Sequence, residues 1–252
     1  MLLKKSLNSP HNHRQGFDAV KNALSSSFNV VNVDLMYSIP NQEKKDWILD
    51  IENIILFEPE NITLNKYKVL QGSESESKIK RGVLNEPQGD WTWYLYARKR
   101  LEASGYIEAR LGTFIKPRCE QKYGRYSYGS NYEIIGVGAG AYSFINGYLF
   151  RASGNVEKFS ANIDRGIYQI GDYVSKKASI KDRMKRYIMY NLYNNEVRRQ
   201  DIKDIFLKDV VEFFSTELER LLKLGLINMN EDTIEVSDVG QQHIKRIVYE
   251  FY

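Results

Sequence analysis

Helical and extended periods alternate along residues 15–69. Apolar residues recur every three or four positions over 15–27 and again over 41–56, which predicts two amphipathic helices. Runs rich in β-branched residues over 30–37 and 61–69 follow these helices and predict two strands. The order helix, strand, helix, strand is typical of βα units with a parallel sheet.

The pattern changes character near residues 150–156, where we place a domain boundary. Upstream of it we expect, in chain order, a surface loop or lid over 71–86, a helix from Asp90 to Gly105, a third strand over 106–115, and a strand from Tyr132 that enters a glycine-rich turn before Phe144. Downstream we expect helices over 156–165, 180–194 and 209–224, a two-stranded wing over 227–236, and a terminal helix over 237–252. We therefore predict an α/β fold with domains 1–153 and 154–252.

Composition and charge narrow the classes of function. The mean hydropathy is −0.48, and no apolar run approaches the roughly 20 residues that cross a bilayer. The start of the chain lacks the apolar core of a signal peptide, so we expect a cytoplasmic protein. The net charge of +4 is dilute, because residues 155–252 contain 16 basic and 16 acidic residues. Acidic residues in the helix that would enter a DNA groove (Glu212, Glu217 and Glu219) argue against DNA binding by the wing module.

Metal and thiol chemistry are not expected from this chain. Cys119 is the only cysteine, which excludes an intramolecular disulfide and a cluster or zinc site built on several thiolates. His11 and His13 lie in a polar segment without nearby acidic residues, and His243 is far along the chain. We predict no metal site and no catalytic cysteine, although Lys116, Arg118 and Lys122 lie near Cys119 in the sequence.

Two motifs leave a structural and a functional interpretation open. The glycines of residues 136–140 would let a backbone approach a phosphate or adenosine, or they would form a close-packed turn; Ala141 stands where G-x-G-x-x-G has its third glycine. Asp34 lies in an apolar strand, where a buried carboxylate needs a partner. It also lies near the carboxyl end of that strand, where barrel folds place their site residues.

Three blocks of the sequence resemble one family. Residues 33–42 (VDLMYSIPNQ) are similar to a strand motif DLMYGLPGQ, and residues 136–143 (GVGAGAYS) to a turn GxGxxAxS. The terminal helix, wing and helix, with Leu224–Ile227 and Val239–Gly240, are similar to a characteristic C-terminal domain. Together they resemble the radical S-adenosylmethionine (SAM) proteins of the oxygen-independent coproporphyrinogen III oxidase and haem chaperone family, over essentially all of this chain but only the last two thirds of a full member.

The resemblance implies an architecture and a set of cofactor-side residues. We expect an incomplete TIM-type βα barrel over 1–153 and a winged-helix-like α+β domain over 154–252. Asp34 would face the ribose hydroxyls of SAM and Met36 its adenine. In relatives, the positions of Gly136, Gly138, Ala141 and Tyr142 lie beside a cofactor molecule.

The sequence departs from the family at its chemical centre. Members hold a [4Fe-4S] cluster with a CxxxCxxC motif, and a GGGT-like strand end binds SAM; neither motif is present here. Ser9 stands where relatives have Arg, Ser38 replaces a Gly, and Lys68 replaces a small or neutral residue. We therefore expect a truncated or split member of the family, without catalytic residues of its own and without a cofactor when alone. Its expected partner is a separate chain that supplies the missing N-terminal strands.

Two other functions remain open from the sequence. The 18 tyrosines and the basic segment 116–131 would suit an acidic, flat aromatic ligand, so the chain could be a haem, porphyrin or protein-partner binding module without radical chemistry. A winged-helix DNA binder is the third alternative, and it predicts an affinity that falls steeply with salt.

Overall fold

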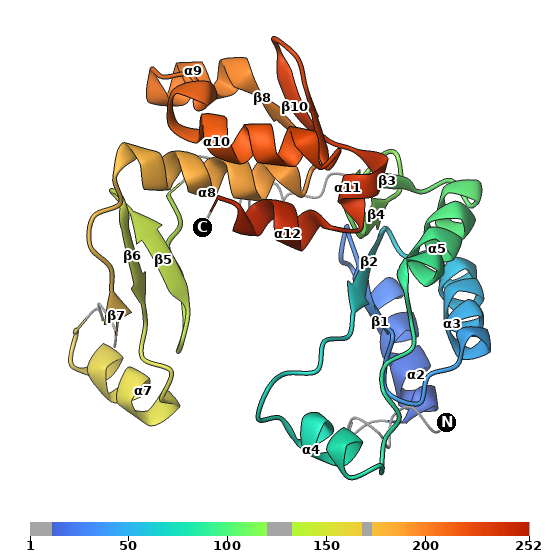
Figure 1. The fold of residues 1–252 in the computed structure, drawn as a ribbon. Coiled ribbons are helices and arrows are strands. Elements are labelled where there is room, and N and C mark those ends of the chain that lie inside the picture. Colours follow the sequence, from blue (N-terminus) through green and yellow to red (C-terminus); the bar gives the residue numbers. More distant parts are fainter. Residues whose placement is uncertain (1–11, 120–132, 168–172, 252) are drawn as a thin grey trace. The chain divides into compact units, whose positions relative to one another are not determined.

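The computed structural model describes residues 12–119, 133–167 and 173–251 and divides the chain into two compact units (Figure 1). The first unit comprises residues 1–121 and the second residues 122–252. The domain boundary predicted at residue 153 lies inside the second unit. Residues 142–151 form a hairpin that pairs with residues 173–174, and this pairing joins the hairpin to the later part of the chain.

The first unit combines helices with one four-stranded sheet. Its elements are α2 (His13–Leu24), β1 (Asn32–Tyr37), α3 (Lys44–Phe57), β2 (Asn61–Lys66), α4 (Glu74–Lys80), α5 (Trp91–Ala103), β3 (Ile107–Arg110) and β4 (Thr113–Ile115). The sheet order is β1-β2-β4-β3, and β1 pairs with β2 in parallel, as the alternating pattern predicts.

Two predictions for this unit are wrong in detail. The single strand expected over 106–115 is an antiparallel hairpin, because Gly112 adopts a left-handed φ of 82° and turns the chain back. The loop expected over 71–86 contains α4. That helix buries no side chain, but the Ser73 hydroxyl caps it and two ion pairs with i,i+4 spacing support it, so its polar sequence carries no apolar period.

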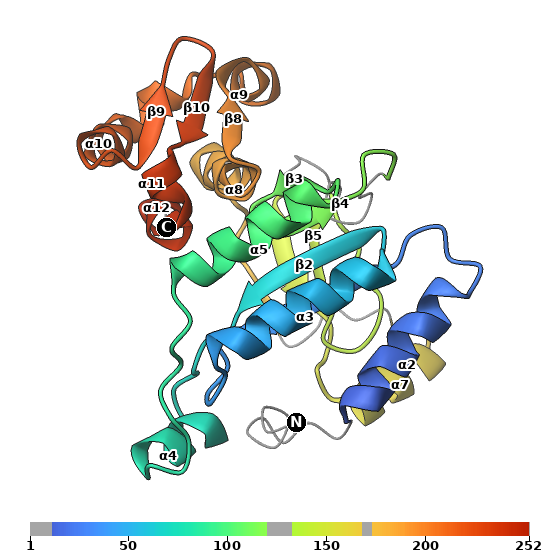
Figure 2. The same ribbon diagram turned by 90° about the vertical axis from the view of Figure 1, so that its right-hand side faces the viewer.

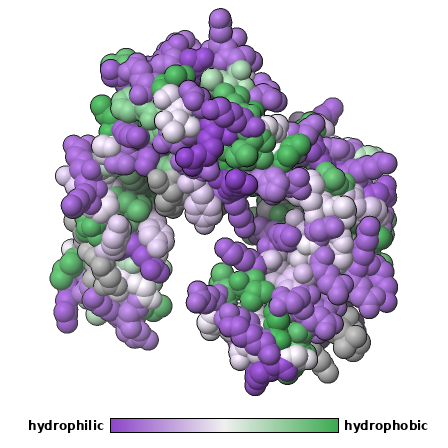
Figure 3. Space-filling view, viewed as in Figure 1, coloured by the Kyte–Doolittle hydropathy of each residue, from purple (hydrophilic) through white to green (hydrophobic). Residues whose placement is uncertain are grey.

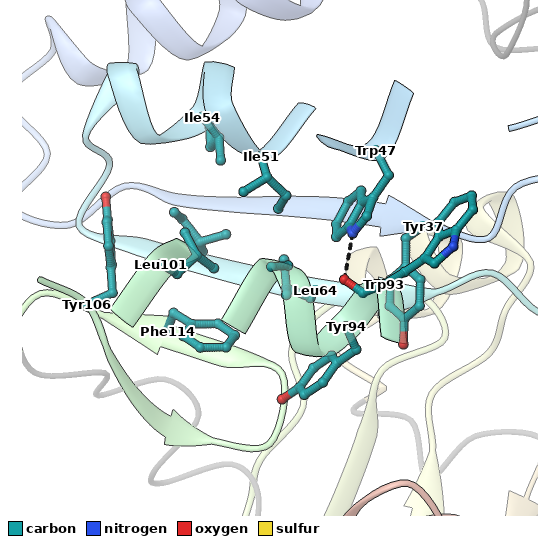
Figure 4. Packing of buried hydrophobic residues seen from close by; sticks show 12 residues of the cluster. Tyr37, Trp47, Ile51, Ile54, Leu64, Trp93, Tyr94, Leu101, Tyr106 and Phe114 are labelled. Atoms are coloured by element: carbon teal, nitrogen blue, oxygen red, sulfur yellow. Dashed lines mark hydrogen bonds between the residues drawn. The ribbon is translucent and has the colours of Figure 1, made fainter. Parts of the chain in front are cut away.

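The core of the first unit lies between the sheet and two helices. Figure 2 shows α3 and α5 along the same face of the sheet, and Figure 4 shows their side chains meeting those of the strands. Trp47, Ile51 and Leu101 are fully buried there. The indole Nε1 of Trp47 donates a hydrogen bond of 2.9 Å to the carbonyl oxygen of Trp93, so the largest buried side chain has its polar atom paired.

The second unit contains two three-stranded sheets and most of the remaining helices. Its elements are β5 (Tyr142–Ile145), β6 (Tyr148–Arg151), α7 (Val156–Asp164), β7 (Tyr173–Val174), α8 (Ile180–Leu192), β8 (Glu196–Arg198), α9 (Arg199–Phe206), α10 (Val210–Lys223), β9 (Ile227–Met229), β10 (Thr233–Val236), α11 (Asp238–Gln241) and α12 (Ile244–Tyr249). The sheets have the orders β5-β6-β7 and β8-β10-β9.

The predicted helices over 156–165, 180–194 and 209–224 and the two antiparallel strands predicted over 227–236 are confirmed, with additions. The three-residue strand β8 joins the wing as a third strand, and α9 precedes α10; neither was predicted. The terminal helix is interrupted between α11 and α12. The strand expected from Tyr132 is reduced, within the described residues, to a single bridge between Ile134 and Phe144, and β5 follows the glycine-rich turn instead.

Candidate functional site

The open face of the first sheet carries side chains from β1 and β2. Because side chains alternate along a strand, the odd-numbered residues of β1 pack into the core and Asn32, Asp34 and Met36 lie on the opposite face. The parallel register sets Asp34 beside Thr63 and Met36 beside Asn65. This face is therefore polar along β2 and mixed along β1.

Asp34 is exposed and belongs to a short hydrogen-bond chain. The side-chain amide of Asn32 donates to a carboxylate oxygen of Asp34 at 2.7 Å, and the hydroxyl of Thr63 donates to the Asn32 carbonyl at 3.1 Å. The carboxylate thus avoids the cost of burial, and it retains lone pairs that face solvent. Met36, with 44% of its surface exposed, offers an apolar contact on the same face.

Asn61 is a residue of this face that the sequence analysis missed. It lies beside Asn32 in the register and is only 3% exposed. Its side-chain oxygen has no hydrogen-bond partner among the described residues. An unpaired buried amide oxygen is uncommon and costly, so it marks a position where a donor is expected. In the sequence its only signal was an asparagine at the start of a strand.

The turn after β1 has a fixed, crowded geometry. Ser38 is fully buried in a left-handed conformation with φ of 62°. Its hydroxyl donates to the Gly89 carbonyl at 3.0 Å, which partly offsets the backbone strain. Burial, reinforced by the charge of Asp90, raises the pKa of the neighbouring Tyr37 to about 12, so this phenol stays neutral. Lys68 is exposed beyond β2, and Ser9 lies outside the described residues.

The glycine-rich turn of the second unit is tightly folded. The Gly136 N–H donates to the Ser143 hydroxyl at 2.9 Å, and the Ala141 N–H donates to the Gly138 carbonyl at 3.2 Å. A Cβ on Gly136 would lie 2.4 Å from the carbonyl oxygen of Tyr142, and Gly138 has a φ of 108°. Both glycines are thus required by the turn itself, which accounts for them without a ligand.

Tyr142 follows this turn and is 55% exposed. The guanidinium carbon of Arg151, on the paired strand β6, lies 5.2 Å from the centroid of that ring. The sequence analysis did not single out Arg151, because its position opposite Tyr142 depends on strand register. The structure places Gly136, Gly138, Ala141 and Tyr142 together in the second unit, and Asp34 with Met36 in the first.

The residues of this chain do not fit a [4Fe-4S] cluster. Such a cluster takes three or four thiolates, and the half-buried Cys119 is the only cysteine of the 252 residues. Within the described residues, no group of three or more His, Cys, Asp or Glu side chains is arranged to hold a metal ion. His11 lies outside these residues, and His243 is exposed.

The surface and the helices give one further negative result. In the described part of the chain, no helix is both long and apolar enough to cross a membrane. On the face drawn in Figure 3, hydrophobic residues appear in scattered groups among hydrophilic ones. The cytoplasmic location stays a prediction.

Comparison with known proteins agrees with the resemblance. No family model matches the chain. The heme chaperone HemW of Lactococcus lactis subsp. lactis is 25% identical over 94% of this chain, and an oxygen-independent coproporphyrinogen III oxidase of Pseudomonas aeruginosa is 21% identical over 98%. The solved structure of coproporphyrinogen III oxidase (HemN) from Escherichia coli, a radical SAM enzyme, superimposes with a TM-score of 0.79 over 99% of this chain at 20% identity. The chain is a homologue of these proteins.

The match covers only part of each relative. The chain spans 62% of the Lactococcus protein, 57% of the Pseudomonas protein and 61% of the Escherichia chain. It shares the α/β fold of the last of these over its own length. What the complete relatives do therefore bears on this chain as a proposal.

Proposed function

We propose that this chain serves porphyrin or haem metabolism and does not carry out radical chemistry by itself. Homology to heme chaperones and coproporphyrinogen oxidases over nearly the whole chain supports the first part. The single cysteine carries the second part, because one thiolate cannot replace the three that bind the cluster in the family. Under this proposal the first unit corresponds to part of a TIM-type βα barrel, and the module from α8 to α12 corresponds to a winged-helix domain.

Anaerobic reconstitution tests the absence of radical chemistry. The purified chain is incubated with iron and sulfide, desalted, and examined by absorbance and electron paramagnetic resonance, followed by an assay for reductive cleavage of SAM. We expect neither a cluster spectrum nor cleavage. A stoichiometric [4Fe-4S] cluster on this polypeptide alone would refute the proposal. A Cys119→Ser variant is the matched control, since it distinguishes iron bound through the thiol from adventitious iron.

A partner polypeptide is the second element of the proposal. Within the described residues β1 pairs with β2 on one side only, so its other edge presents unpaired backbone groups. Beside it lies a pocket of about 250 Å³ between α2, β1 and α3. Its lining is mostly apolar and also includes polar side chains: Phe17, Val20, Val33, Leu35, Ile54 and Phe57 with Asp34, Asp50 and Asn53. An added strand would be held by backbone hydrogen bonds along β1 and by these apolar contacts.

Co-expression tests the partner. The chain is produced together with the segment of the Lactococcus heme chaperone that carries the clustered cysteines. We expect a co-purifying complex in which amides of β1 gain protection from hydrogen exchange. Two separate proteins without added protection of β1 would contradict the proposal. In such a complex Asp34, Met36 and the turn at Gly136, Gly138, Ala141 and Tyr142 are the proposed SAM-side residues, and Asp34→Ala should weaken SAM binding.

A porphyrin-binding module without any radical chemistry is the second candidate function. The exposed Tyr142 and the cation of Arg151 beside it favour this candidate, because an aromatic surface next to a cation suits a flat, acidic ligand. A haem titration followed in the Soret region tests it. We expect a saturable shift, and a spectrum that changes only in proportion to free haem would rule it out.

A further inference from the structure

One face of the sheet β5-β6-β7 carries an arginine between two exposed tyrosines. The antiparallel registers set Tyr142 opposite Arg151 and Arg151 opposite Tyr173, so the three side chains share a face. Tyr142 is 55% exposed and Tyr173 is 52% exposed, and Arg151 is exposed between them. This row of side chains is called the Tyr–Arg–Tyr ladder below.

The guanidinium of Arg151 is held in place by uncharged groups. Its Nε donates to the Gly140 carbonyl oxygen at 3.2 Å, and its guanidinium carbon lies 5.2 Å from the centroid of the Tyr142 ring. A Cβ atom on Gly140 would lie 3.5 Å from the terminal Nη2, and one on Gly154 would lie 3.6 Å from it. Both are ordinary van der Waals distances, so the guanidinium packs against the backbone at Gly140 and Gly154.

Arg151 has no ion-pair partner among the described residues. Other arginines with a fixed orientation are paired: Arg199 with Asp209 at 3.0 Å and Arg100 with Glu52 at 2.7 Å. An oriented guanidinium without a carboxylate keeps N–H donors available for an anion, and its planar fork matches a carboxylate in two parallel hydrogen bonds. Little side-chain entropy remains to be lost when such a ligand binds.

The next residue of β5 on the same face, Phe144, has its own cationic neighbour and is half-buried. Phe144 lies on this face two residues after Tyr142, and the guanidinium carbon of Arg186 from α8 sits 4.5 Å from its ring centroid. Arg186 also lies 5.1 Å from the ring of Tyr190. Arg186 is thus engaged with these two rings and is not part of the ladder.

The geometry points to the Tyr–Arg–Tyr ladder as a binding site for a carboxylate carried on a flat aromatic ring system. On the function proposed above, on which this inference rests, the ligand is a carboxylate-bearing porphyrin. Arg151 would bind the carboxylate, and Tyr142 and Tyr173 would supply apolar surface for the ring. The charge of the ligand should matter as much as its shape, because the only cation of the ladder is otherwise unpaired.

Fluorescence titration of the full chain with coproporphyrin III tests this site. The variants are Arg151→Gln, which removes the charge, and Arg151→Lys, which keeps the charge but loses the fork. Arg246→Gln is the matched control, because Arg246 is an exposed arginine of the same unit that has neither an ion pair nor a cation–π contact among the described residues. A porphyrin of the same size that carries pyridinium cations tests the ligand side without any substitution. Circular dichroism verifies that each variant is folded.

We expect Arg151→Gln to weaken coproporphyrin binding about tenfold, which corresponds to one charge-assisted hydrogen-bonded contact. Arg151→Lys should bind with intermediate affinity, Arg246→Gln should match the wild type, and the cationic porphyrin should bind at least tenfold more weakly than coproporphyrin to the wild type. Equal binding by the wild type and Arg151→Gln would overturn the site while the porphyrin function stands. No binding to the wild type would overturn both.

Discussion

Replacement of Gly240 by alanine should destabilise the second unit although alanine is the better helix former. Gly240 lies in α11, is buried, and packs against the backbone that follows α10. A Cβ at this position would lie 2.0 Å from the carbonyl oxygen of Leu226 and 3.0 Å from its carbonyl carbon. Contacts this short do not persist, so either α11 or the backbone at Leu226 has to move by about 1 Å.

The cost of that movement can be worked out from the contacts it disturbs. The Leu226 carbonyl accepts a hydrogen bond from the Ser237 N–H at 3.1 Å, and the Ser237 hydroxyl caps α11 at the Gly240 N–H. Overpacking of a buried site costs about 1–3 kcal/mol, and loss of one buried hydrogen bond costs about 1 kcal/mol. Alanine returns about 1 kcal/mol in helix propensity. We therefore expect a net loss of about 1–3 kcal/mol in the free energy of unfolding.

Urea unfolding followed by far-ultraviolet circular dichroism measures this change. Gly154→Ala is the control, because a Cβ there would meet only the Nη2 of Arg151 at 3.6 Å and its φ is not left-handed. The free energy of unfolding of Gly154→Ala should lie within about 0.5 kcal/mol of the wild-type value. If Gly240→Ala were as stable as the wild type, or more stable, the close packing of α11 on Leu226 would be wrong.

Two further changes probe other contacts. Gly89→Ala should lower the free energy of unfolding by about 1–3 kcal/mol, because its Cβ would lie 2.7 Å from the Cβ of Ser38. In a double-mutant cycle measured by calorimetry, Ser38→Gly should restore part of this loss. Purely additive effects of the two substitutions would contradict the contact. Asp209→Asn keeps the N-cap of α10 but loses the ion pairs with Arg199 and Lys203, at a cost of up to about 1 kcal/mol. Burial raises the pKa of Asp209, but the Val211 N–H and the two cations more than offset this and hold the pKa below its usual range. The charge of Asp209 therefore stabilises the fold at neutral pH and ceases to do so as the pH falls through the lowered pKa. The stability difference between the wild type and Asp209→Asn in urea melts should shrink toward acidic pH. A difference that does not change with pH would refute this role.

Sequence reasoning located most helices because they carry apolar residues at helical spacing. The stripe of α10, with Phe214, Leu218 and Leu221 in register, predicted both its position and its buried face. Sequence reasoning failed for elements that have no recognisable apolar period. α4 has no buried stripe, and β8 is too short to show a period.

The candidate sites were predictable only in part, for a related reason. The glycines at 136 and 138 stood out as a motif. The structure explains Gly136 by the close approach of the Tyr142 carbonyl oxygen and Gly138 by its positive φ. Neither Arg151 nor Asn61 could be recognised as a site residue in the sequence, because the role of each depends on the residue that faces it on a neighbouring strand. No periodicity within one segment encodes a partner in another.

By itself, the sequence determined the positions of the longer helices and of the strands β1 and β2, and it determined that this polypeptide lacks the thiolates for a cluster. Both follow from local properties: the spacing of apolar residues along one segment and the count of one residue type. Only the tertiary structure decided that Asp34 is exposed in a hydrogen-bond chain with Asn32, and that Arg151 lies beside Tyr142 without an ion-pair partner among the described residues. These features depend on strand register and burial, which arise when segments distant in the chain compete for the same core.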